Sequence, residues 1–150
     1  MRVFLECKPD ETLAVALGVL RNTVVHSGDK GRVAKALREN RNVTGLVDED
    51  PGRVDPPTLS KYVEVAASHD VKLKVDRAQN NRLVVICPRL EPWLIKTAKA
   101  ANLKMEQFNL SENLPELDAE INHRLPNLER MLNKLIEMKN QRLLYLKSLL

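Results

Sequence analysis

Short β-prone runs and helical stretches alternate over the first 48 residues, and this alternation limits the folds that the chain can adopt. We expect strands at residues 2–6, 23–26 and 42–47, where apolar and β-branched side chains cluster. Between them, residues 10–20 and 29–40 space their apolar side chains as amphipathic helices do. A β-α-β-α-β order gives parallel strands with right-handed crossovers and helices that cover the sheet. The sequence therefore predicts an α/β fold with a mostly parallel sheet.

The middle of the chain continues the pattern less regularly. A proline-rich stretch, residues 51–57, predicts a loop. We expect a helix over residues 58–69, a half-exposed strand over 71–75 and an interior strand over 82–86, followed by a helix over 90–101.

The last part of the chain is rich in leucine and poor in β-branched residues. Its apolar side chains recur at helical spacing, and Pro115 and Pro126 stand where helices start. We therefore divide the chain into an α/β domain, residues 1–110, and a helical C-terminal extension, residues 111–150. Either this extension packs on the sheet and completes a three-layer domain, or it offers a surface to a protein partner or a second copy.

Composition is that of a soluble globular domain. With 150 residues, 43% hydrophobic and 29% charged, the chain can bury a core without disulfides or a structural metal. We expect Cys7 and Cys87 to be free thiols in a reducing compartment. No apolar run approaches the about 18 residues of a membrane span, and the first apolar run is too short for a signal peptide. We therefore expect a cytoplasmic protein that does not enter a membrane.

Acidic side chains stand where two of the predicted strands end. Glu6 ends the first strand, Asp48 follows the third, and Asp50 comes two residues later. The carboxyl ends of parallel strands meet at one edge of a sheet, where open α/β folds bind their ligands. Carboxylate oxygens suit Mg²⁺ or Mn²⁺, which leave coordination positions for phosphate oxygens. If the first and third strands are neighbours, these residues share one metal-binding edge.

Three motifs together resemble the Toprim (topoisomerase–primase) domain, especially its small stand-alone forms and the form in OLD-type nucleases. The sequence ECKPDE at residues 6–11 is similar to the family's first motif, in which an acid is followed by glycine and then by another acid about four residues later. The glycine turn reads SGDKG at residues 27–31, and the closing D-x-D motif reads LVDEDPG at residues 46–52. The resemblance covers residues 1–55 and is looser over 71–101. Cys7 departs from it, because the family has glycine there.

The resemblance implies a three-layer Toprim/Rossmann-like fold and roles for individual residues. It implies that Glu6 is the general acid or base and that Asp48 and Asp50 bind the metal ion. Glu91 is either a further ligand or an acid favoured by the dipole at a helix start. Lys30 and Arg32 either contact phosphates or belong to a solvated helix face.

Two further acids, Asp10 and Glu11, have two interpretations as well. Both fall in the first turn of the predicted helix, where acids are favoured. Both could instead be site residues, since they end the first motif of the resemblance.

Basic side chains flank the acidic motif. Residues 21–41 carry six basic and two acidic side chains, and residues 72–104 carry eight and two. This pattern suits a metal-bridged contact with nucleic acid, although two solvated helix faces beside an acidic turn would produce it too. Aromatic residues make up only 3% of the chain, too few for a platform that stacks bases.

Other site classes lack their signals. The three histidines have no zinc-site spacing, and no Walker loop or nucleophile elbow occurs. A phosphoacceptor receiver would carry its acid pair at the first strand rather than the third.

Together these features predict divalent-metal-dependent phosphoryl transfer on nucleic acid, a nuclease-like activity with Mg²⁺ or Mn²⁺ as cofactor. The alternative is a non-catalytic binding or regulatory module on the same scaffold, which Cys7 and the small size of the chain favour.

Overall fold

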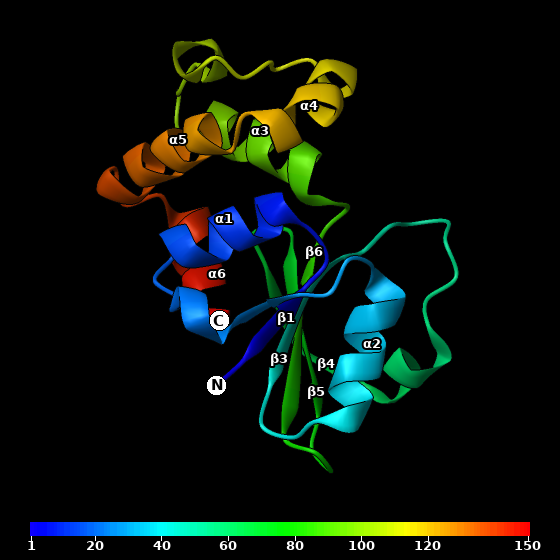
Figure 1. The fold of residues 1–150 in the computed structure, drawn as a ribbon. Helices are drawn as coiled ribbons and strands as arrows, with labels where there is room; N and C mark the ends of the chain where they lie inside the picture. The colour runs from blue at the N-terminus through cyan, green and yellow to red at the C-terminus, as the bar shows by residue number, and fades with distance from the viewer.

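Six strands form one mixed sheet in the computed structural model, which describes residues 1–150 (Figure 1). The strand order across the sheet is β2-β1-β3-β6-β5-β4. The strands are β1 (Val3–Leu5), β2 (Val24–His26), β3 (Thr44–Asp48), β4 (Val63–Ser68), β5 (Val71–Asp76) and β6 (Asn81–Ile86). Strands β2, β1, β3 and β6 run parallel, whereas β5 is antiparallel to both of its neighbours. The predicted α/β class is confirmed, with a sheet that is parallel at its centre and antiparallel at one edge.

The helix predicted over residues 58–69 is wrong. A 3₁₀ turn, Pro57–Lys61, occupies the start of this segment, and β4 occupies the rest. Strand β4 forms a hairpin with β5, and its two turn residues, His69 and Asp70, have φ angles of +52° and +59°. Two successive positive φ angles match the twist of a two-residue hairpin. Pairing with β5 therefore outweighs the helical preference of the alanines in β4.

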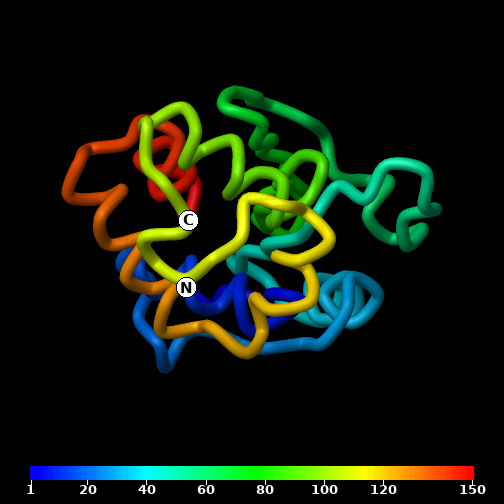
Figure 2. Tube along the Cα trace, turned by 90° about the horizontal axis from the view of Figure 1, so that it is seen from above, coloured from blue at the N-terminus to red at the C-terminus, as the bar shows by residue number.

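Helices cover both faces of the sheet (Figures 1 and 2). They are α1 (Lys8–Ala16), α2 (Lys30–Glu39), α3 (Leu90–Ala100), α4 (Leu114–Glu120), α5 (Leu125–Glu137) and α6 (Gln141–Leu149). Helix α2 lies on one face over a core of 10 buried residues that includes Phe4 and Leu83. Helices α1, α3, α4, α5 and α6 contribute to a core of 25 buried residues that includes Leu5 and Ile86. Side chains of adjacent residues in β1 thus enter different cores, as the pleat of a strand requires.

A glycine allows α2 to approach the sheet. A Cβ atom on Gly45 would lie 3.0 Å from Leu37 Cδ1 and 3.2 Å from both Leu83 Cδ1 and Val33 Cγ1. Since real Cβ atoms rarely come so close to neighbours, the bare backbone of β3 sets how near α2 packs.

The C-terminal helices are part of the main core. Helix α5 packs against α1, and leucines of the extension are completely buried, among them Leu117, Leu128 and Leu146. The exposed large apolar residues of the extension are Met138 and Leu144. The leucine-rich faces are therefore covered within the chain. No helix combines the length and the hydropathy that crossing a bilayer would take.

Candidate functional site

The acidic residues predicted at strand ends lie at one edge of the sheet. Because β1 pairs directly with β3, Glu6 comes next to Asp48, and Glu6 Oε2 accepts a hydrogen bond from the Asp48 backbone N–H at 3.0 Å. Asp48 Oδ1 in turn accepts from the backbone N–H of Leu90, the first residue of α3, at 3.0 Å. The two carboxylates are therefore fixed by backbone groups of neighbouring strands and of a helix start.

Asp50 continues this edge in a constrained turn. Its φ angle is +50°, and its backbone N–H donates a hydrogen bond to the Pro88 carbonyl at 3.0 Å. The acidic turn therefore lies beside the residues that come after β6. The side chain of the intervening Glu49 points elsewhere and forms an ion pair with Lys72 at 2.9 Å. The D-x-D spacing thus separates Asp48 and Asp50 from the acid between them.

A further acid, Asp10, belongs to the same cluster. It is only 1% exposed, and its Oδ2 accepts a hydrogen bond from Cys7 Sγ at 3.2 Å, while its Oδ1 is buried without a partner. Glu11 instead pairs with Arg21 at 3.0 Å. From the sequence, Asp10 and Glu11 have the same two interpretations, and only their packing distinguishes them.

Burial and mutual repulsion raise the pKa values of these carboxyl groups. Burial, followed by the charges of Asp10, Glu6, Glu91 and Asp50, raises the pKa of Asp48 to about 9. Burial is also the main cause that raises the pKa of Asp10 to about 7, and it raises the pKa of Glu6. The cluster therefore favours protons or another cation.

Glu91 lies in the first turn of α3 at the border of the cluster. Its Oε2 accepts a hydrogen bond from Arg89 Nη1 at 3.0 Å. The Arg89 guanidinium also holds both carboxylate oxygens of Asp118 in α4, at 2.8 and 2.9 Å. Glu91 is thus close enough to raise the pKa values of Asp48 and Asp10, but it has a cationic partner of its own.

A groove of about 280 Å³ opens beside the cluster. Glu6 and Asp50 line it together with the start of α2 and the loop that follows Asp50. The remaining lining residues are Asp29, Lys30, Gly31, Arg53, Val54, Asp55 and Pro56.

The two predicted phosphate contacts are in different situations. Lys30 Nζ donates to the Glu49 carbonyl at 3.1 Å and to Asp55 Oδ1 at 2.9 Å, and it lies 3.9 Å from Asp50 Oδ2. Its ammonium group therefore holds the loop in place. The Arg32 side chain is 73% exposed, and its one ion pair is with Asp29 at 3.7 Å. Of the two, Arg32 is free to meet a phosphate.

The chemistry of the cluster suits a hard divalent cation. All of its donors are carboxylate oxygens, which Mg²⁺ and Mn²⁺ prefer, and the unpartnered Oδ1 of Asp10 could accept such an ion. In this conformation, no group of three or more His, Cys, Asp or Glu side chains is arranged to hold a metal ion.

Comparisons of the chain with protein-family models, with curated proteins and with solved structures found no match. The candidate function thus depends on the motifs and the geometry.

Proposed function

We propose that this edge of the sheet is a divalent-metal-dependent phosphoryl-transfer site, of the Toprim type, that cleaves nucleic acid. The observation that carries the proposal is the gathering of Glu6, Asp10 and Asp48 from two neighbouring strands and a helix start, with Asp10 Oδ1 buried and unpartnered. A buried oxygen atom without a partner is costly to a fold unless something binds it. Mg²⁺ or Mn²⁺ would satisfy that oxygen and relieve the repulsion among the carboxylates.

Each carboxylate has a distinct part in this proposal. Asp48, Asp50 and Asp10 would hold the metal ion once their side chains turn toward a common point, since they are not arranged around one in this structure. Glu91 at the border would be a further ligand if Arg89 releases it. When bound, the ion polarises the phosphoryl group and offsets charge on the leaving oxygen. Glu6 lines the groove and has a raised pKa, so it is suited to hold or release a proton at the oxygen that attacks or leaves.

Cleavage assays with and without millimolar Mn²⁺ test the proposal, on single-stranded DNA, duplex DNA and RNA. We expect metal-dependent cleavage of at least one substrate by the wild-type protein and its loss in Asp50→Asn. Glu137→Gln is the matched control, because Glu137 lies 74% exposed on α5. Full cleavage by Asp50→Asn, or none by the wild-type protein on any substrate, would overturn it.

A non-catalytic binding module is the second candidate, and Cys7 favours it. The Cys7 thiol donates a hydrogen bond to Asp10 Oδ2. This hydrogen bond uses one of the carboxylate oxygens that a metal ion would need as ligands. The backbone at Cys7 is extended, with φ −145°, so the fold does not demand glycine there. Under this second function, the wild-type protein binds Mn²⁺ without cleaving, and Cys7→Gly strengthens Mn²⁺ binding because it frees Asp10.

A further inference from the structure

The outer side of α2 carries a row of basic side chains with little acidic compensation. Arg32, Lys35 and Arg38 are exposed, and Arg41 follows just beyond the helix. Except for the 3.7 Å contact of Arg32 with Asp29, none of the four forms an ion pair. The one acid on this side of the helix, Glu39, is unpaired too. The surface therefore has a net positive charge.

This basic row begins at the candidate site. Asp29, Lys30 and Gly31 at the start of α2 line the groove beside Glu6 and Asp50. From Arg32 to Arg38 the row extends about 9 Å along the helix axis, the length of about three stacked nucleotides of one strand. The row thus runs from the groove toward the end of α2.

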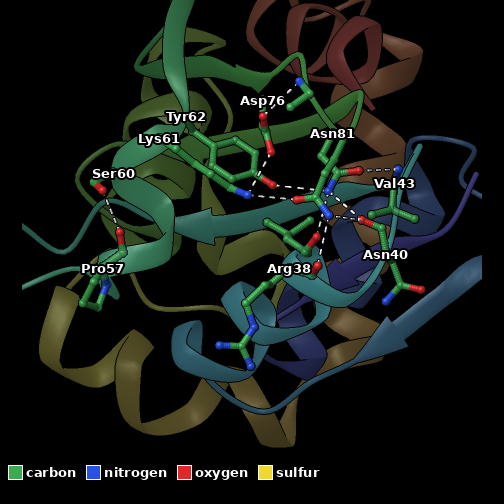
Figure 3. A network of polar contacts seen from close by, with 12 residues as sticks. Arg38, Asn40, Val43, Pro57, Ser60, Lys61, Tyr62, Asp76 and Asn81 are labelled. Carbon is green, nitrogen blue, oxygen red and sulfur yellow. Dashed lines mark hydrogen bonds and ion pairs between the residues drawn. The ribbon is translucent and has the colours of Figure 1, made fainter.

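The 3₁₀ turn Pro57–Lys61 contacts α2, but the side chains of Arg32, Lys35 and Arg38 remain exposed. The remaining α-helices lie on the opposite face of the sheet, and α2 stands apart from them (Figures 1 and 2). Figure 3 shows the Arg38 guanidinium pointing away from the polar network at the end of the helix. A linear polyanion could therefore lie along the row.

The end of α2 is hydrogen-bonded to the segment that precedes β6 and to β6 itself. At the end of α2, Asn81 Nδ2 donates to the carbonyls of Leu37 and Asn40 at 2.8 and 2.9 Å, and Gln79 Nε2 donates to the Arg38 carbonyl at 3.0 Å (Figure 3). These amides satisfy carbonyls that a helix end leaves open. Because neutral amides, and not the basic side chains, bind these carbonyls, the exposed cations remain available to bind phosphate groups.

We propose that the outer side of α2 binds the phosphate backbone of single-stranded nucleic acid and guides it into the carboxylate groove. This inference rests on the proposed function and names the form of its substrate. A row one cation wide matches one backbone rather than the two of a duplex. With so few aromatic side chains, backbone charge rather than base stacking dominates the contact, so binding is independent of sequence and sensitive to salt.

Fluorescence anisotropy with a labelled oligo-dT in EDTA tests the inference without cleavage. The variant Lys35→Gln/Arg38→Gln should make the slope of log K against log salt less negative by about 1.4, because each phosphate contact of a single strand contributes about −0.7. This loss corresponds to roughly 25-fold weaker binding at 0.1 M salt if the proteins bind equally at 1 M. The control Lys99→Gln/Arg130→Gln removes two exposed, unpaired cations from α3 and α5 and should leave the slope unchanged.

The outcomes separate this inference from the proposed function. An unchanged slope in Lys35→Gln/Arg38→Gln, absence of wild-type binding at low salt, or tighter binding of a duplex of equal length overturns the α2 inference. Binding that depends on α2 without any Mn²⁺-dependent cleavage overturns the phosphoryl-transfer proposal alone. Cleavage of single strands that is equally fast in the α2 variant and the wild-type protein overturns only the role of α2.

Discussion

At the scale of single residues, the site is a set of carboxyl groups that the fold holds close together. Asp10 is buried, Glu6 and Asp48 are half-buried, and their pKa values are raised by this burial and by neighbouring carboxylates. A carboxyl group whose pKa is raised on folding takes up protons in the folded state. Its contribution to stability is full below the unfolded pKa and is lost as the pH rises through the folded pKa.

This linkage predicts a pH dependence for the metal-free protein. For Asp48, stability should fall as the pH rises from about 4, near the pKa of an unfolded aspartate, to about 9. Asp48→Asn should be more stable than the wild-type protein at pH 9 and should have a flatter profile, because asparagine resembles the protonated acid. Each unit of pKa shift is equivalent to about 1.4 kcal/mol, which urea unfolding at several pH values resolves.

The control for this prediction is Glu137→Gln, whose profile should follow that of the wild-type protein because its carboxylate is exposed. An Asp48→Asn profile as steep as that of the wild-type protein would contradict the assignment of the raised pKa to Asp48.

At the scale of elements, the parallel centre of the sheet brings the site together. Strands β1 and β3 were predictable from their apolar runs, and their pairing places Glu6 beside Asp48. The burial of Asp10 and the ion pair between Arg89 and Asp118 were not predictable, because they depend on how the helices pack against one another. The β4–β5 hairpin was missed because its turn, His69-Asp70, contains no glycine to mark it.

The contact of α2 with β3 gives a second prediction. Gly45→Ala should destabilise the protein by about 1–3 kcal/mol, because the added methyl group meets side chains of both α2 and β6. Chemical denaturation measures the change. Gly45→Ala combined with Leu37→Val should recover part of the loss, because Leu37 Cδ1 is the nearest atom to the new methyl group. A Gly45→Ala protein as stable as the wild type would contradict the close approach.

At the scale of the whole molecule, the extension and the α/β part share one core. Leu146 is 0% exposed and Leu144 on the same helix is 37% exposed. Leu146→Ala should therefore cost about 2–5 kcal/mol, and Leu144→Ala about 0.5 kcal/mol or less. Thermal unfolding should remain a single transition in both. Separate transitions for residues 1–110 and the extension would show instead that the two fold independently.

Metal binding would stabilise the molecule as a whole. An ion at about 100 times its Kd adds about 2.7 kcal/mol, which raises Tm by about 2–8 °C for domains of this size range. We expect such a rise with Mn²⁺ for the wild-type protein and none for Asp48→Asn. An equal rise in both would place the ion elsewhere.

The packing of α5 on α1 has a consequence for synthesis of the chain. Translation releases α1 first, but α5 begins about 110 residues later, roughly 5–20 s at usual elongation rates. During this interval the apolar side of α1 has no covering helix, and Arg142 of α6 has not yet reached Asp70, 72 residues before it. The nascent chain therefore cannot complete its core until its last helices are synthesised. A ribosome that stalls before α5 exposes apolar surface of α1 and of the sheet to chaperones and proteases.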